Sequence, residues 1–208
     1  MGEGRLIVIE GLDSVGKTTL INNLKKKFGK NSNYVFTEEP GGTAPGKEIR
    51  KILENWHLDD MTRFYLFKAD RIDHLNHVVL PALKQGKTVI CSRFIYTALI
   101  YQFSKEIKLE ESYAKTIADL PEFDYLEKKI ELILLCDTVD NIRKRLSRRE
   151  TLDSLELDVM KNIEERRERY IDMVNFCNEN EKVKSGEIVN ICETPKQTFD
   201  KVIELLRL

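Results

Sequence analysis

A glycine-rich segment near the N-terminus carries residue types that bind phosphate groups. Residues Gly11–Thr18 read GLDSVGKT and match the pattern G-x-x-x-x-G-K-[ST]. Glycines let the backbone turn tightly enough to direct several N–H groups at one phosphate, and a helix that follows adds its unpaired N-terminal donors. Lys17 would reach the β- and γ-phosphates, and the Thr18 hydroxyl would bind Mg²⁺. The segment therefore predicts a site for a nucleoside triphosphate with Mg²⁺.

The alternative for this segment is a glycine-rich turn that binds nothing. An apolar run directly before it and a helical pattern directly after it favour the phosphate site, because the motif acts only in a strand–loop–helix context. The residues expected at the triphosphate are Gly11, Asp13, Ser14, Val15, Gly16, Lys17, Thr18 and Thr19, with Thr18 as the metal ligand.

Five short apolar runs are predicted to form the strands that support this loop. Several of them, such as LIVIE and ELILLCD, are almost continuously apolar, which is typical of parallel strands buried on both faces. Longer helical segments separate them, so the β–α alternation predicts an α/β fold with a doubly wound parallel sheet and helices on both faces. The predicted strands are Arg5–Glu10, Asn33–Glu38, Lys87–Ser92, Ile130–Asp137 and Glu187–Ile191.

The helices are predicted from apolar spacing, from prolines in first turns and from glycines at helix ends. No repeat or linker interrupts the pattern, so residues 1–208 are expected to form one domain. The predicted helices are Lys17–Gly29, one that starts after Pro45, Asp60–Gln85 with a kink at Pro81, Phe94–Phe103, Glu110–Leu120, Asp140–Arg149, Ser154–Glu181 and Pro195–Leu206.

Composition narrows the function classes. The chain has 208 residues with 34 Lys and Arg against 35 Asp and Glu, a net charge of −1, so no basic field favours nucleic acid as a partner. The apolar runs are too short for a signal peptide or a membrane span, and no membrane partner is expected. Four cysteines lie far apart without a CxxC pair, which argues against zinc and disulfides. We expect a reduced, cytoplasmic protein.

Further stretches carry a resemblance to a known family. IVIEGLDSVGKTT, VFTEEPGGT, FKADRIDHL, SRFIYTALIYQ and RLSRRETLDSLE follow one another in the order and spacing of thymidylate kinases, over essentially the whole chain. EEPGGT is the most discriminating, because GTPases and adenylate kinases lack it at that place. The resemblance implies a three-layer P-loop NTPase fold with a five-stranded parallel sheet. It also implies transfer of the γ-phosphoryl group of ATP to dTMP with Mg²⁺, and a homodimer.

The resemblance assigns the base pocket of the acceptor to residues on two helices. Phe67 and Arg71 share a helix face, where the ring would stack on thymine and the guanidinium would donate to a carbonyl. Without the resemblance, Phe67 would be a core residue and Arg71 a solvated charge. Thr97 and Gln102 resemble polar base contacts, and Tyr101 resembles the ring that crowds the sugar 2′ position.

The acceptor's sugar and phosphate are assigned in the same way. Asp13 is similar to the loop acid that holds the 3′-hydroxyl, and Glu39 and Pro40 lie in the EEPGGT segment beside the acceptor. Arg50 and Arg93 would clamp the acceptor phosphate, and Arg93 is also expected to act in catalysis, with Lys17.

The basic run Arg143–Arg149 lies where the family has its lid, here expected over about residues 143–156. A guanidinium that closes over the transferring phosphoryl group neutralises its charge. Because the phosphate loop has Asp-Ser-Val where some relatives have an arginine, Arg148 and Arg149 are the expected catalytic lid residues. Arg145 would stack on adenine. The alternative is an ordinary solvated helix face.

Two positions depart from the family pattern. Glu38 replaces the usual arginine before EPGGT, and Ser92 replaces the usual aspartate of the Asp-Arg pair, with Glu10 or Glu39 as possible replacements for its charge. These departures leave two alternatives open. A deoxynucleoside kinase would use Glu39 or Glu38 as a general base on an acceptor without phosphate. A nucleotide-binding regulator would bind ATP without turnover.

Overall fold

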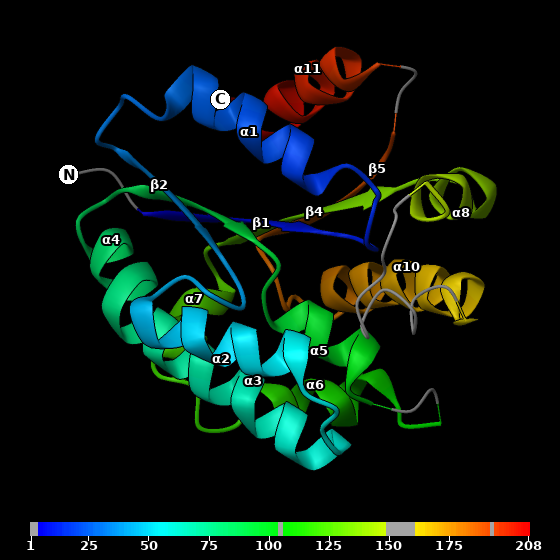
Figure 1. Cartoon of the computed structure of the whole chain (residues 1–208). Helices are drawn as coiled ribbons and strands as arrows, with labels where there is room; N and C mark the ends of the chain where they lie inside the picture. Colours follow the sequence, from blue (N-terminus) through cyan, green and yellow to red (C-terminus); the bar gives the residue numbers. More distant parts are fainter. Residues whose placement is uncertain (1–3, 104–105, 149–160, 192–193) are drawn as a thin grey trace.

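The computed structural model describes residues 4–103, 106–148, 161–191 and 194–208, which form a five-stranded sheet between two layers of helices (Figure 1). The strand order is β2-β3-β1-β4-β5, and every pairing is parallel. The predicted α/β fold is therefore confirmed. The strands are β1 (Arg5–Glu10), β2 (Tyr34–Glu38), β3 (Thr88–Ser92), β4 (Ile130–Cys136) and β5 (Ser185–Asn190).

The alternation of side chains along β1 explains why helices cover both faces. Leu6 and Val8 belong to one buried cluster, while Ile7 and Ile9 belong to the other. Because successive side chains on a strand face opposite sides of the sheet, a strand that is apolar throughout needs a cover on each side. All seven residues of β4 are buried in the same way.

The helices divide between the two faces (Figure 1). One face packs against α1 (Lys17–Phe28) and α11 (Pro195–Leu206). The opposite face packs against a larger set, α3 (Asp60–His74), α4 (Leu80–Lys84), α5 (Ile95–Tyr101), α6 (Leu109–Ile117), α7 (Phe123–Glu127) and α10 (Ile163–Glu179). The helix α2 (Ala44–Asn55) packs on α3, and α8 (Val139–Leu146) follows β4 at the end of the sheet where β1 leads into α1.

The long helix predicted over Asp60–Gln85 is divided by a π-helical turn, Leu75–Val79, between α3 and α4. The cause lies at Pro81, which offers no N–H and whose ring crowds the carbonyl four residues earlier, so the turn before it widens. The helix α7 was not predicted, because five residues are too few to show a helical period.

Other boundaries differ by a few residues, as fraying helix ends and strand ends usually do. The predicted helix Asp140–Arg149 ends at Leu146 as α8, and Arg149 lies outside the described residues. Of the predicted helix Ser154–Glu181, residues 154–160 also lie outside them, and α10 forms the described part.

Three cysteines, Cys91, Cys136 and Cys177, are buried free thiols, while Cys192 lies outside the described residues. In the part of the chain that the structure describes, no helix is both long enough and apolar enough to cross a bilayer.

Candidate active site

The predicted phosphate loop joins β1 to α1 in a backbone conformation that glycine permits. Gly11 and Gly16 have φ of 142° and 106°, and Ser14 has φ of 63°. A Cβ at Gly11 would also lie 2.6 Å from the carbonyl oxygen of Leu135. Residues with positive φ within a tight turn help to direct successive N–H groups into one concave nest, and α1 begins directly behind this turn. The loop can therefore cradle a phosphate.

Lys17 is the first residue of α1, and its ammonium group lies inside the loop. The Nζ atom donates to the carbonyl oxygens of Gly11, at 2.8 Å, and Leu12, at 2.7 Å. The side chain is only 7% exposed. The ammonium therefore stands beside the phosphate nest and can exchange a carbonyl contact for a phosphate oxygen.

A cavity of about 830 Å³ opens beside the loop. It receives side chains from the loop, β2, α2, α3, α5, α8 and the segment that enters α11. Most residues predicted for the site line it, namely Asp13, Ser14, Val15, Gly16, Lys17, Thr18, Thr19, Glu39, Pro40, Arg50, Phe67, Arg93, Thr97, Tyr101, Gln102 and Arg145. Gly11, Arg71 and Arg148 are not among the lining residues, and Arg149 lies outside the described residues.

Arg93 links the end of β3 to the phosphate loop. Its Nη2 atom donates to Asp13 Oδ1 at 2.5 Å, and its Nη1 atom donates to Thr97 Oγ1 at 3.3 Å. Burial lowers the pKa of Arg93, but the Asp13 carboxylate together with Tyr101, Tyr170 and Glu10 outweighs this effect and holds that pKa well above its ordinary value. Arg93 is therefore a fixed positive charge on the cavity wall beside the phosphate loop.

The Tyr101 ring lies between two guanidinium groups. The Cζ atom of Arg166, on α10, lies 4.5 Å from the ring centroid, and that of Arg93 lies 5.8 Å from it. The Tyr101 hydroxyl is buried and has no partner among the described residues. The ring is thus held by cation–π contacts rather than by its hydroxyl, and it faces the cavity as a rigid wall.

A buried charge network supports the side of the cavity that Glu39 and Phe67 line. Glu39 Oε2 accepts from Arg71 Nε at 2.9 Å, and Glu39 Oε1 lies 2.9 Å from His74 Nδ1. Burial raises the pKa of Glu39, but Arg71 and His74 outweigh it and the pKa is lowered. Arg71 stands next to Glu39 rather than on the cavity surface, so its contact with the base remains a prediction.

Asp70 adds a second carboxylate to this network. Its Oδ1 atom accepts from the Gly41 N–H at 3.0 Å, while its Oδ2 atom is buried without a partner among the described residues. Burial, with the charge of Glu39 adding to it, raises the pKa of Asp70 to about 6. This side of the cavity therefore holds two carboxylates that repel each other.

The charge reversal at Glu38 is matched by an ion pair at the cavity's rim. Glu38 Oε2 accepts from Arg50 Nη1 at 2.9 Å, and Arg50 Nε donates to Glu54 Oε1 at 2.8 Å. All three side chains line the cavity. Arg50, expected to clamp the acceptor phosphate, is shared between two carboxylates here.

The carboxylates considered as replacements for the aspartate missing at Ser92 both bind protein groups. Glu10 accepts from the backbone N–H of Phe94 at 2.8 Å and from the Thr97 hydroxyl at 2.8 Å, and its other contacts include the Tyr170 hydroxyl at 3.2 Å. Burial raises the pKa of Glu10. Glu10 therefore anchors α5 and α10 to β1, and Glu39 is held by Arg71 and His74.

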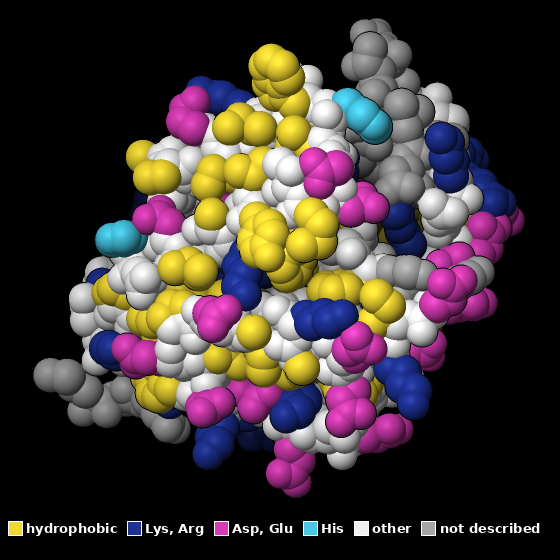
Figure 2. Space-filling model, turned by 90° about the horizontal axis from the view of Figure 1, so that it is seen from below, with side chains coloured by type: hydrophobic (Ala, Val, Ile, Leu, Met, Phe, Trp, Pro, Cys, Tyr) yellow, Lys and Arg dark blue, Asp and Glu magenta, His cyan; other side chains and the backbone are white. Residues whose placement is uncertain are grey.

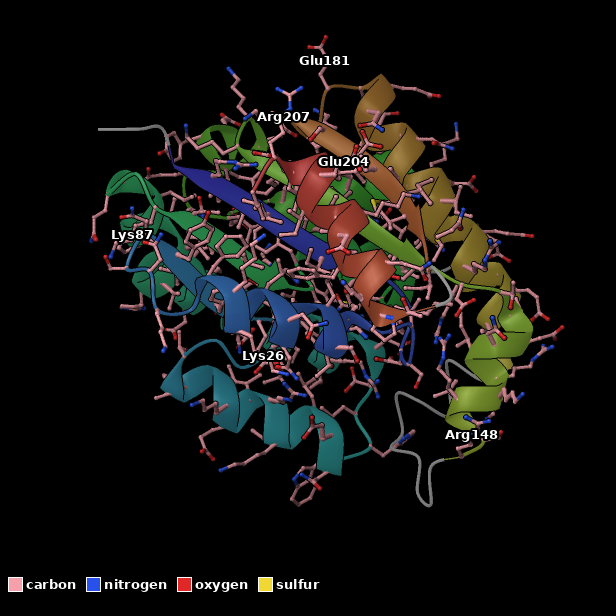
Figure 3. The ribbon with its side chains drawn as sticks, turned by 90° about the horizontal axis from the view of Figure 1, so that it is seen from above. Lys26, Lys87, Arg148, Glu181, Glu204 and Arg207 are labelled. Atoms are coloured by element: carbon pink, nitrogen blue, oxygen red, sulfur yellow. The ribbon has the colours of Figure 1, made fainter. Side chains whose placement is uncertain are left out.

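The basic run on α8 divides between the cavity and solvent. Arg145 Nη1 donates to the Ser14 carbonyl at 3.0 Å, and the same guanidinium pairs with Asp137. Arg145 thus lines the cavity beside the phosphate loop. Arg148 lies two residues beyond the C-terminal end of α8 and is exposed (Figure 3). Its lid role remains a prediction.

Sequence reasoning missed several lining residues. Arg63 lies one turn before Phe67 on α3, and its Nε atom is buried without a partner among the described residues. Glu54 lies one turn after Arg50 on α2. Helical spacing from a predicted residue would have found both. Ile191, Pro195 and Thr198 also line the cavity, and nothing in their residue types marks them.

The residues near the loop fit a Mg²⁺ ion that is bound mainly by phosphates. Thr18 is exposed to the cavity, and its hydroxyl is the hard oxygen ligand that Mg²⁺ prefers. Within the described residues no group of three His, Cys, Asp or Glu side chains could hold a metal by itself. The ion would therefore depend on the nucleotide.

A phosphate loop that lines a cavity together with charged side chains from β2, α2 and α3, on a parallel sheet covered on both faces, is typical of P-loop nucleotide kinases. A model of the family described as thymidylate kinase matches residues 9–188, most of the chain. The chain belongs to the thymidylate kinase family.

Individual relatives agree with this assignment. A thymidylate kinase of Ligilactobacillus salivarius is 32% identical over 97% of this chain and 95% of its own length. One of Neorickettsia sennetsu is 41% identical over 62% of this chain, a match that spans 64% of that protein. The solved thymidylate kinase of Candida albicans has a TM-score of 0.72 at 22% identity, covering 99% of this chain and 92% of that one, which shows the fold.

These comparisons confirm the family resemblance, the P-loop NTPase fold and the prediction of a dTMP kinase. They do not favour the deoxynucleoside kinase or the inactive regulator.

Proposed function

We propose that this chain transfers the γ-phosphoryl group of ATP to the phosphate of dTMP, giving ADP and dTDP. The observation that carries the proposal is that one cavity is lined both by the phosphate loop and by Arg50, Phe67 and Tyr101. A donor and an acceptor bound in one cavity can meet in line, which removes most of the entropic barrier to transfer.

The loop amides and Lys17 hold the β- and γ-phosphates, and Lys17 leaves its two carbonyl contacts to do so. Thr18 would bind Mg²⁺, which neutralises charge on the phosphate oxygens when it is present. Arg93 stands between the two phosphate groups, where Asp13 keeps it in place. Arg148 and Arg149 close over the transferring group as the lid, and Arg145 stacks on adenine.

The acceptor needs no strong general base, because a phosphomonoester dianion is already a competent nucleophile. This agrees with the positions of the carboxylates, since Glu39 is held by Arg71 and His74. Phe67 stacks on thymine, Arg71, Thr97 and Gln102 contact the base, and Tyr101 excludes a 2′-hydroxyl.

Steady-state kinetics test the acceptor assignment. With ATP as donor, we expect dTMP to give the highest kcat/KM in a panel that includes dUMP, other monophosphates and thymidine. Thymidine is the discriminating member because it offers a hydroxyl rather than a phosphate. Turnover of thymidine without turnover of dTMP would contradict the proposal.

We also propose that the enzyme is a cytoplasmic homodimer. Three large apolar side chains at the start of α3 and just before it are exposed, Trp56 at 66%, Met61 at 59% and Tyr65 at 59%. Hydrophobic side chains gather on the face of the molecule that carries α2 and α3 (Figure 2), and such a patch favours an interface. Light scattering at the mass of one chain, at micromolar concentration, would contradict the dimer.

A further inference from the structure

The acceptor end of the cavity has a rim in which one guanidinium is shared by two carboxylates. Arg50 lies between Glu38, at 2.9 Å, and Glu54, at 2.8 Å. The three side chains are 42%, 55% and 39% exposed, in the order Arg50, Glu38, Glu54. The rim triad, as we call these three residues, is therefore solvated and able to exchange partners.

The rim triad carries a net negative charge at the place where the acceptor brings a phosphate dianion. Like charges at short range repel, and solvent and salt screen this repulsion only in part at a cavity mouth. The positive groups nearby are Arg93, which is paired with Asp13, and Arg63, which lines the same cavity. An acceptor phosphate that binds Arg50 must therefore take it from its carboxylates.

We propose that Glu38 and Glu54 compete with the acceptor phosphate for Arg50 and thereby set how weakly this enzyme binds its monophosphate. The proposal rests on the proposed function for the identity of the acceptor, dTMP. Binding of the phosphate moves the Arg50 donors from the carboxylates to the phosphate oxygens. Because exposed ion pairs contribute little stability, this exchange leaves the fold intact.

The neighbouring Glu39 shows why the competition is confined to the rim. Its side chain is 3% exposed and pairs with Arg71, which is 4% exposed. Removing one partner of such a buried pair leaves an unpaired charge and destabilises the fold. Glu38 can be changed without that effect, so it is the residue through which acceptor affinity can be adjusted.

The experiment replaces Glu38 by glutamine, which keeps the shape of the side chain and removes its charge. We expect Glu38→Gln to lower the KM and the calorimetric Kd for dTMP about fivefold, with the KM for ATP unchanged. Thymidine, which occupies the same pocket without a phosphate, should bind both forms with the same Kd. Glu54→Gln should act in the same direction.

Glu48→Gln is the matched control, since Glu48 lies on α2 and pairs with Lys51 at 2.7 Å away from the cavity. It should leave every constant unchanged. The gain from Glu38→Gln should also disappear when Arg50 is replaced by glutamine.

Three results would overturn the proposal. They are an unchanged or weaker affinity for dTMP in both glutamate variants, an equal gain for thymidine, or a gain that survives without Arg50. If the wild-type enzyme bound dTMP but did not phosphorylate it, the proposed function would fail, while the calorimetric comparison would still decide the role of the rim triad.

Discussion

The proposed donor end of the cavity, at the phosphate loop, is formed mainly by backbone groups and one lysine, whereas the proposed acceptor end is formed by ion-paired side chains from several elements. At the donor end, glycine conformations at Gly11 and Gly16 fix where the amides lie. At the proposed acceptor end, Arg50 has two carboxylate partners, while Arg71 pairs with Glu39 behind the cavity surface and Arg93 pairs with Asp13 beside the phosphate loop.

This difference has a physical consequence. Backbone donors that are fixed by the fold need no reorganisation when a phosphate arrives, so they suit a group that every nucleotide shares. Paired side chains must exchange partners when a ligand arrives, so their neighbours can adjust affinity and selectivity. We therefore expect substitutions at the donor end to affect turnover most, and those at the acceptor end to affect affinity, selectivity and stability.

The largest effect is expected at Lys17. Lys17→Ala removes the ammonium group from the loop. The variant should lower kcat by about 10³, because the ammonium is a preorganised charge next to the phosphate that is transferred. Lys26→Ala is the control, since Lys26 lies exposed on the same helix (Figure 3). Rapid-quench measurement of dTDP formation reports the chemical step. Near-normal turnover in Lys17→Ala would contradict the expectation that substitutions at the phosphate loop affect turnover most.

The lid arginines come next. Replacing Arg148 and Arg149 together by alanine should lower kcat by about 10³, the low end of what an arginine that neutralises charge in the transition state contributes, with a smaller change in the KM for dTMP. Lys144→Ala, an exposed cation on the same helix α8, should have no effect. If the double variant kept a turnover within a few fold of wild type, the basic run would be an ordinary solvated helix face and not a catalytic lid.

Tyr101 should affect selectivity rather than rate. Tyr101→Ala is expected to reduce the preference for dTMP over its ribonucleotide by about tenfold, because the wall against the 2′-hydroxyl is lost. Tyr101→Phe should keep the preference, since the ring is held by Arg93 and Arg166 and not through its hydroxyl. Competition between the two nucleotides measures the ratio of kcat/KM directly. An unchanged ratio in Tyr101→Ala would exclude this role.

The smallest effect concerns stability at the acceptor end. The pKa of Asp70 is raised from 3.8 to about 6 in the folded chain, so the fold loses stability as the pH rises through that window. Asp70→Asn keeps the Oδ1 acceptor for Gly41 and should raise Tm at pH 8 by about 2–4 °C, with no gain at pH 4.

Differential scanning calorimetry at pH 8 and at pH 4 measures the change in Tm. Asp200→Asn, an exposed position on α11, is the control variant. A lower Tm for Asp70→Asn at pH 8 would show that the charge stabilises the acceptor end.

The donor end could be predicted from the sequence because a short contiguous pattern specifies it. The run GLDSVGKT predicts the loop and the position of its lysine without knowledge of the fold, and it also predicts Thr18 as the metal ligand. The sheet could be predicted for a similar reason, since apolar runs such as ELILLCD mark strands buried on both faces.

The acceptor end could be predicted only in part. The resemblance supplied Phe67, Arg93 and Tyr101, which do line the cavity, but side-chain pairing depends on contacts between distant segments. Nothing in the sequence shows that Glu39 is held by Arg71 and His74, or that Arg50 is shared between Glu38 and Glu54. The π-helical turn before Pro81 could not be predicted either, because the spacing of apolar residues does not distinguish one wider turn within a long helix.

The most direct test of the donor site is a crystal structure of the enzyme with Mg²⁺, dTMP and a non-hydrolysable ATP analogue. We expect the β- and γ-phosphates on the loop between Gly11 and Thr18, with Lys17 Nζ moved from the carbonyls of Gly11 and Leu12 to phosphate oxygens. An analogue bound elsewhere, with Lys17 still on those two carbonyls, would contradict the account.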